Sequence, residues 1–243
     1  MTLPAALLTA AGSAREPKCY ANTQDANEWV CWQYVEDRSD QILDALQWHV
    51  QITLAALVLA VLIAFPLALL ARRFPRAEAW VLGGATGLYT IPSLALFPLF
   101  LPFTGISATT VVLGLALYAL TVLVRAILDG LRGVPDEVRE SATGLGYGRG
   151  KLLLKVELPL ALPVIVAGLR VATVSTVALT TVGSLVEGTY GGLGRLIAHG
   201  VDANFRAELL TASVLCVLLA LVLDAVLVLA QRALTPWARG GRV

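Results

Sequence analysis

The chain has 243 residues, of which 57% are hydrophobic and only 14% are charged, and its mean hydropathy is +0.76. A soluble domain usually carries about 25% charged residues. An apolar stretch of about 20 residues crosses the hydrocarbon core of a bilayer as a helix. The composition therefore excludes an ordinary soluble protein and predicts an all-α, polytopic membrane protein. The net charge of +1 indicates no particular partner.

The first 46 residues are mostly polar and precede the first long apolar run. Their own start, residues 1–14, is apolar but lacks the positive residues that open a secretory signal peptide, so we expect a mobile or interfacial terminus. Cys19 and Cys31 lie in the polar part. They could form a disulfide if this segment faces an oxidising compartment, or they could remain free thiols.

A helical pattern begins at Ser39. Its apolar side chains recur at the spacing of one helix face, on Ile42, Leu43, Leu46 and Val50. We expect an amphipathic lead-in to the first membrane span, with Trp48 and His49 near the lipid headgroups. Residues 1–46 are thus interpreted as an extracytoplasmic segment that ends in this lead-in.

Five apolar runs are long enough to span a membrane. The predicted spans are 50–71, 80–101, 108–128, 160–182 and 208–230. In the second span, Pro92 and Pro98 predict a helix kink, although the carbonyl groups that they free could instead line a cavity. The membrane domain would cover residues 47–232, and residues 233–243 would form a tail.

The Lys and Arg residues divide unevenly between the two ends of such a bundle. Twelve fall on the side that holds Arg72, residues 129–159 and the C-terminus, five fall on the other side, and Arg170 lies within a span, which accounts for all 18. Cytoplasmic loops carry the excess of Lys and Arg. The sequence therefore predicts a cytoplasmic C-terminus and an N-terminus outside a bacterial plasma membrane.

The loop between the third and fourth predicted spans, residues 129–159, is charged and interrupted by glycines. Pro135 is suited to the first position of a helix, and Asp136 and Glu137 follow where the helix dipole favours negative charge. This helix would end in the glycine cluster at residues 144–148. A second helix near 149–157 would then be broken by Pro159 before the fourth span.

Two capped helices joined by glycines form a compact projection, which favours a docking surface for a cytoplasmic partner over a mere connector. The stretch GLGYGRGKL is not a phosphate-binding loop, because Leu145 stands five positions before Gly150 and Leu152 follows Lys151. We therefore expect no nucleotide site, no catalytic residue and no metal site on this chain.

The spacing of this loop resembles the EAA loop of ABC importer permeases. The matching positions are Glu140, Ser141 and Ala142, then Gly146 after three residues, Val156 after nine more, and finally Leu158 and Pro159. Only Ser141 departs from the pattern, and it keeps a small side chain. In that family the loop forms coupling helices that dock into a cleft of a separate ATPase subunit.

Longer stretches resemble the permeases of osmoprotectant importers, which carry glycine betaine, choline or carnitine. They include WQYVEDRSDQILDALQWHVQITL, VELPLALPVIVAGLRVAT and GGLGRLI, within about residues 32–232. The resemblance implies a type I ABC importer transmembrane domain that works with a second permease copy or a paralogue, two ATPase subunits and an external binding protein. ATP and Mg²⁺ would be bound by the ATPase, and no nucleic acid is implied.

Several residues outside the loop are candidates for the translocation path. Arg170 and Asp224 are charges within predicted spans, which could pair as a structural clamp or face the path. Thr173, Thr176 and Thr180 could pack helices or line a weakly polar passage. Glu187 stands where the family has a small apolar residue.

The glycine-rich stretch after the fourth span suggests an external gate that meets the binding protein. Its candidate residues are Tyr190, Gly191, Gly192 and Gly194. Tyr190 could also make a cation–π contact with a quaternary ammonium group.

The main alternative function is a permease for another small solute, such as an amino acid. A secondary transporter or channel without ATP is disfavoured by the absence of internal inverted repeats and by the docking-type loop. A membrane scaffold without transport is the remaining alternative. A permease should co-purify with an ATPase, and this co-purification should depend on Glu140. A secondary transporter, a channel or a scaffold should not show it.

Overall fold

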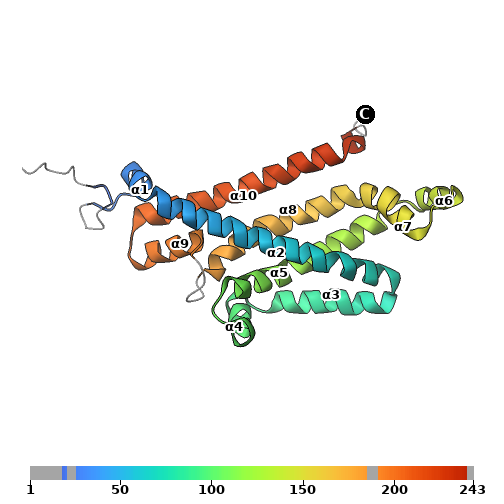
Figure 1. Cartoon of the computed structure of the whole chain (residues 1–243), viewed down its shortest axis with the longest axis horizontal. Coiled ribbons are helices and arrows are strands. Elements are labelled where there is room, and N and C mark those ends of the chain that lie inside the picture. Colours follow the sequence, from blue (N-terminus) through green and yellow to red (C-terminus); the bar gives the residue numbers. More distant parts are fainter. Residues whose placement is uncertain (1–17, 21–25, 185–190, 240–243) are drawn as a thin grey trace, which may run out of the picture.

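The computed structural model describes residues 18–20, 26–184 and 191–239, and within them it forms helices connected by short turns (Figure 1). In chain order the elements are α1 (Trp32–Asp37), α2 (Ser39–Arg73), α3 (Pro75–Thr90), α4 (Ser93–Thr104), α5 (Ala108–Arg132), α6 (Asp136–Gly144), α7 (Arg149–Leu152), the π-helical turn η1 (Leu153–Glu157), α8 (Leu158–Gly183), α9 (Leu193–Asp202), α10 (Arg206–Leu234) and the 3₁₀ turn η2 (Pro236–Arg239).

Among the described residues, four helices are long and apolar enough to cross a membrane: α2, α5, α8 with the turns before it, and α10. The pair α3 and α4 makes a fifth pass if the two are counted together. The number of passes agrees with the prediction. Spans four and five match α8 and α10 closely, whereas the third span extends to Arg132 in α5.

The first pass differs from the predicted lead-in followed by a span. α2 is one helix of 35 residues from Ser39 to Arg73, and Pro66 lies inside it without ending it. Within the predicted apolar face, Ile42 is buried whereas Leu43 is 59% exposed. His49 was expected at the headgroups but is fully buried, and its Nε2 lies 3.1 Å from the Val177 carbonyl of α8.

The second pass is broken rather than kinked. α3 and α4 meet at an angle of 103°, at Ile91 and Pro92. A proline has no backbone N–H and favours an extended conformation in the residue before it, and Ile91 is extended here. The Tyr118 hydroxyl of α5 donates a hydrogen bond to the Ile91 carbonyl, so α5 satisfies a backbone carbonyl at the break.

The core of the bundle lies between α2, α5 and α8, where small residues allow the backbones to approach closely. α2 presents an alanine every fourth residue, at positions 56, 60, 64 and 68, and all four are fully buried. On α8, a Cβ added at Gly168 would overlap Ala126 of α5, and one added at Gly183 would overlap Val111. This packing fixes the ends of α5 and α8, between which the predicted docking loop is inserted.

The two ends of the bundle differ in their helices (Figure 1). The end drawn at the left holds α1, α9 and the start of α10, while the opposite end holds α6, α7 and the last residues of the described chain. The charged loop and the N-terminal segment therefore lie at opposite ends, as an odd number of passes requires.

A small cap covers the end formed by α9 and the start of α10. The structure joins Cys19 and Cys31 by a disulfide with Cα atoms 5.8 Å apart. Tyr34 packs its ring edge-on against Phe205, and burial raises the pKa of the Tyr34 hydroxyl. Asn27 hydrogen bonds both the Asn204 carbonyl (2.6 Å) and the backbone N–H of Arg206 (3.0 Å). The cap thus fastens the N-terminal segment to the start of α10.

The disulfide yields a test of the cap. Replacing Cys19 and Cys31 by serine should lower the free energy of unfolding of the cap by about 3 kcal/mol, because the unfolded segment is no longer restricted by the bridge. This is the size expected for a loop of this length. Hydrogen exchange should then become faster at the Glu28 amide, which donates to the Cys19 carbonyl at 3.1 Å.

The matched control is Cys216→Ser, because Cys216 is a free thiol on α10 and its loss should leave this exchange unchanged. Equal Glu28 protection in the double variant and in the oxidised wild type would contradict the role of the bridge.

Candidate functional site

The first helix of the loop between α5 and α8 has the predicted start and end. α6 begins after Pro135 and carries Asp136 and Glu137 in its first turn. At its end the Tyr147 N–H donates to the Ala142 carbonyl (3.1 Å) and the Gly146 N–H to the Thr143 carbonyl (2.9 Å). These two bonds form a Schellman motif.

Gly146 contributes to this motif through its backbone conformation, and not because another part of the chain packs closely against it. Its φ of +81° lies in the left-handed region that favours glycine, and a Cβ there would meet nothing within 4 Å in this chain. Gly146 therefore caps α6.

The EAA-like residues of α6 divide between solvent and bundle. Glu140 and Ser141 are exposed, whereas Ala142 is 7% exposed and faces inward. Leu145 follows at the tip with 79% of its surface exposed. α6 therefore presents a carboxylate and an apolar side chain outward at the end of the bundle.

The second half of the loop does not stop at Pro159. α7, η1 and α8 run on as one helical segment from Arg149 to Gly183. A proline removes one helical hydrogen bond and crowds the preceding turn, and the wider π turn over Leu153–Glu157 accommodates it. The other motif residues, Val156 and Leu158, are half-buried where this turn enters α8, as is Pro159 itself.

A cluster of charged side chains that was not predicted from the sequence lies beneath α6. Glu157 is 3% exposed, and Arg72 at the end of α2 binds both of its oxygens, at 2.8 and 2.5 Å. Arg139 of α6 places its Nε 3.1 Å from Glu157 Oε1. The signal in the sequence was a carboxylate directly before Leu158, at the edge of an apolar span, where an unpaired charge is costly.

A second ion pair lies at the same end but does not involve α6. Arg132 at the end of α5 binds the Glu78 carboxylate of α3, at 2.8 and 2.5 Å. The hydrogen bonds between Arg132 and Glu78 are exposed to solvent, whereas Glu157 is buried. The end of α5 is thus tied to the start of α3.

The two charges within spans form a pair. Arg170 donates from Nε and Nη2 to the two oxygens of Asp224, at 2.7 and 2.8 Å. The pair joins α8 to α10, and a charge pair in a span needs protein or water beside it rather than lipid. The arrangement fits the clamp that was considered for these two residues.

The threonines of α8 use their hydroxyl groups within the bundle. Thr173, Thr176 and Thr180 each donate to the carbonyl four residues earlier, at 2.7–2.8 Å, and all three are buried. Thr180 also meets the Thr53 hydroxyl of α2 at 3.1 Å. In this conformation Thr180 contacts α2, and Thr176 is buried within the bundle.

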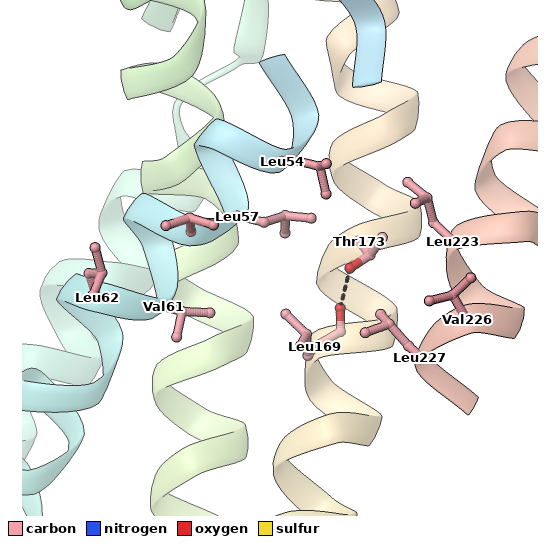
Figure 2. A pocket seen from close by; sticks show the side chains of 10 residues that line it. Leu54, Leu57, Val61, Leu62, Leu169, Thr173, Leu223, Val226 and Leu227 are labelled. Carbon is pink, nitrogen blue, oxygen red and sulfur yellow. Dashed lines mark hydrogen bonds between the residues drawn. The ribbon is translucent and has the colours of Figure 1, made fainter. Parts of the chain in front are cut away.

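Thr173 also borders an apolar cavity of about 320 Å³ between α2, α8 and α10, and it is the one polar side chain among those that line it (Figure 2). Figure 2 shows Leu54, Leu57 and Val61 on one wall and Leu223, Val226 and Leu227 on the other. Asp224 borders a second apolar cavity of about 360 Å³, between α8 and α10.

At the opposite end, the predicted external gate is only partly described. Glu187 and Tyr190 lie outside the described residues. Gly191, Gly192 and Gly194 precede or open α9, a helix that the sequence did not predict. A Cβ at Gly194 would overlap the backbone of Thr181, so α9 sits directly on the end of α8, and Gly192 lies against the His49 ring.

The fold is shared with solved ABC importers. The inward-facing MetNI methionine ABC transporter matches with a TM-score of 0.72 over 82% of this chain and 99% of that chain, at 21% identity. An amino acid ABC transporter solved with histidines matches with a TM-score of 0.68 over 84% of this chain and 99% of that chain, at 17% identity. The bundle and its projecting loop thus define the transmembrane domain of a type I ABC importer.

The family model described as "Binding-protein-dependent transport system inner membrane component" matches residues 56–240. The choline transport system permease protein OpuBB of Bacillus subtilis is 33% identical over 84% of this chain and 93% of its own length. The osmoprotectant import permease protein OsmW of Salmonella typhimurium is 34% identical over 84% and 96%. The chain belongs to the family of binding-protein-dependent transport system inner membrane components.

The Arg170–Asp224 pair yields a test of the clamp. Asp224→Asn should lower the thermal midpoint of the detergent-solubilised protein, because it leaves the Arg170 charge without its partner. Replacing both residues, with Arg170→Gln added, should recover most of the loss. The midpoint is measured by size-exclusion chromatography after heating. A single variant as stable as the wild type, or a double variant no better than the single one, would contradict the clamp.

Proposed function

We propose that the chain is the permease subunit of an ATP-driven importer that translocates a quaternary ammonium compatible solute, such as glycine betaine, choline or carnitine. An external binding protein would deliver the solute, and a separate ATPase would hydrolyse ATP. Family membership supports a transport role for this chain, and ATP and Mg²⁺ would be bound only by the ATPase.

The observation that carries this proposal is the projecting loop. α6 stands beyond the end of the bundle (Figure 1), with Glu140 and Ser141 exposed on it. Leu145 at the end of α6 is 79% exposed, and Leu154 of η1 in the same loop is 62% exposed. A carboxylate flanked by exposed apolar side chains suits a protein partner better than water. This surface supports docking into an ATPase subunit.

The excess of Lys and Arg at this end supports a cytoplasmic location for the loop and the C-terminus. The N-terminus, the disulfide cap and α9 would then lie outside, where the binding protein docks. The complete assembly would contain a second permease, either identical or related, and two ATPase subunits. Closure of the ATPase pair would move the loops, and the passes would rock between outward-open and inward-open states.

The substrate class rests on the relatives. Two relatives are 33% and 34% identical to this chain over 84% of its length, and their names specify choline and osmoprotectants. A third relative, from Bacillus subtilis, is a glycine betaine/carnitine/choline permease protein at 33% identity over 84% of this chain and 88% of its own. The solved methionine and amino acid transporters are less similar and support only the fold. A quaternary ammonium solute is therefore favoured over the amino acid alternative.

Reconstitution tests the proposal. Liposomes that contain the chain, its ATPase and its binding protein should accumulate labelled glycine betaine, choline or carnitine only when ATP is present. Omission of the binding protein should abolish the accumulation. Hydrolysis of ATP without uptake of any of the three solutes would overturn the proposed substrate class. Uptake without an ATPase would overturn the permease function.

The exposed carboxylate of α6 can be tested separately. Glu140→Lys should reduce uptake to background and reduce the amount of co-purified ATPase. The Glu140 side chain is exposed to solvent, so its effect on transport should come from its contact with the ATPase. The amount of the chain in the membrane should not change. Glu36→Lys is the matched control for the amount of co-purified ATPase, since Glu36 is also exposed on a short helix but lies at the opposite end of the bundle. Normal uptake by Glu140→Lys would contradict the docking role.

A further inference from the structure

The charge cluster around Glu157 joins parts of the chain that are far apart in sequence. Arg72 ends α2, Arg139 lies in the middle of α6, and Glu157 ends the π turn before α8. Arg139 Nη2 also donates to the Leu131 carbonyl of α5 at 2.7 Å. Three side chains therefore connect four helices at this end, namely α2, α5, α6 and α8.

The cluster also connects the two halves of the EAA-like motif. Arg139 directly precedes Glu140, and Glu157 directly precedes Leu158 and Pro159. The contact between Arg139 and Glu157 thus spans the loop from its docking helix to the start of α8. Among the described residues, this is the one ion pair that joins α6 to another helix; the pair of Arg139 and Asp136 stays within α6.

The two contacts of Glu157 differ in strength. Arg72 binds both carboxylate oxygens with parallel hydrogen bonds, the strong geometry for this pair. Arg139 Nε lies 3.1 Å from Oε1 but lacks the alignment of a hydrogen bond. α2 and α8 are therefore held firmly together, and α6 is held to them by a looser attraction. Because the Glu157 side chain is only 4% exposed, water screens this attraction weakly.

We propose that Glu157 is a positioning residue that transmits the movement of the docked α6, through Arg139, to α2 and α8 together. The inference rests on the function proposed above. A force on α6 would reach α5 and α8 along the chain in any case, and α2 through its packing against them, but the direct polar link from α6 to α2 runs through Glu157 and Arg72. Loss of the cluster should therefore uncouple ATP hydrolysis from transport rather than prevent docking.

Two variants separate the links. Arg139→Gln removes the contacts of α6 with Glu157 and with the Leu131 carbonyl while it leaves the Arg72–Glu157 pair in place, so the bundle should still fold. Glu157→Gln removes both contacts. The matched control is Glu78→Gln, which breaks a similar pair at the same end without touching α6. Each is reconstituted with the ATPase and the binding protein, and the number of solute molecules taken up per ATP hydrolysed is measured.

We expect Arg139→Gln and Glu157→Gln to keep the ATPase bound and to hydrolyse ATP while uptake is lost, so that this ratio falls towards zero. Glu78→Gln should keep the wild-type ratio. A purely structural role would lower the amount of complex but leave the ratio unchanged. An unchanged ratio in Arg139→Gln would overturn the proposal.

A second measurement does not depend on transport. Spin labels on cysteines introduced at Thr143 of α6 and Arg73 of α2, both exposed, report the distance between these helices in the full chain, with Cys216 replaced by serine. Arg139→Gln should broaden the distance distribution, and Glu78→Gln should not. A distribution that Arg139→Gln leaves unchanged would overturn the link. If the wild type shows no ATP-dependent uptake, the proposed function fails, and the spin-label distances still decide whether the cluster fastens α6.

Discussion

The close packing of α2, α5 and α8 is the constraint on which the other features depend. Water is absent from the membrane core, so helix association there relies on contact between backbones that small residues permit. The buried alanines of α2 and the glycines of α8 supply this contact. Because α5 and α8 are held together along their length, the loop between them must leave and re-enter the bundle at one place. The position of α6 therefore follows from residues that lie within the membrane.

The same constraint explains which parts of the fold could be predicted. Long apolar runs reveal passes, so the number of passes and the bounds of α8 and α10 followed from hydropathy. The start of α6 followed from Pro135 and its end from the glycine cluster. Hydropathy does not show direction, however, and the 103° break at Pro92 looked like a kink. The Ile91 carbonyl at this break is bonded by Tyr118, which lies in another helix.

The candidate site was predictable where its chemistry is local. The spacing from Glu140 to Pro159 identified the loop, and two lone charges in apolar runs suggested the pair of Arg170 and Asp224. The cluster around Glu157 was not predictable, because Arg72 is 85 residues away along the chain. His49 was misplaced for the same reason, since its partner is the Val177 carbonyl of a distant helix.

A buried ion pair is weak evidence for stability, because removing two charges from water costs free energy that their attraction only partly offsets. Glu157 lies where an apolar side chain would also have filled the space beneath α6. An apolar contact has no preferred direction, whereas Arg72 holds the Glu157 carboxylate in one orientation, and that carboxylate then attracts Arg139 of α6. A loop that must return to one geometry after every cycle of transport gains more from this directional contact than from additional burial. The position of the cluster, between the docking surface and the first residues of α8, is consistent with that requirement.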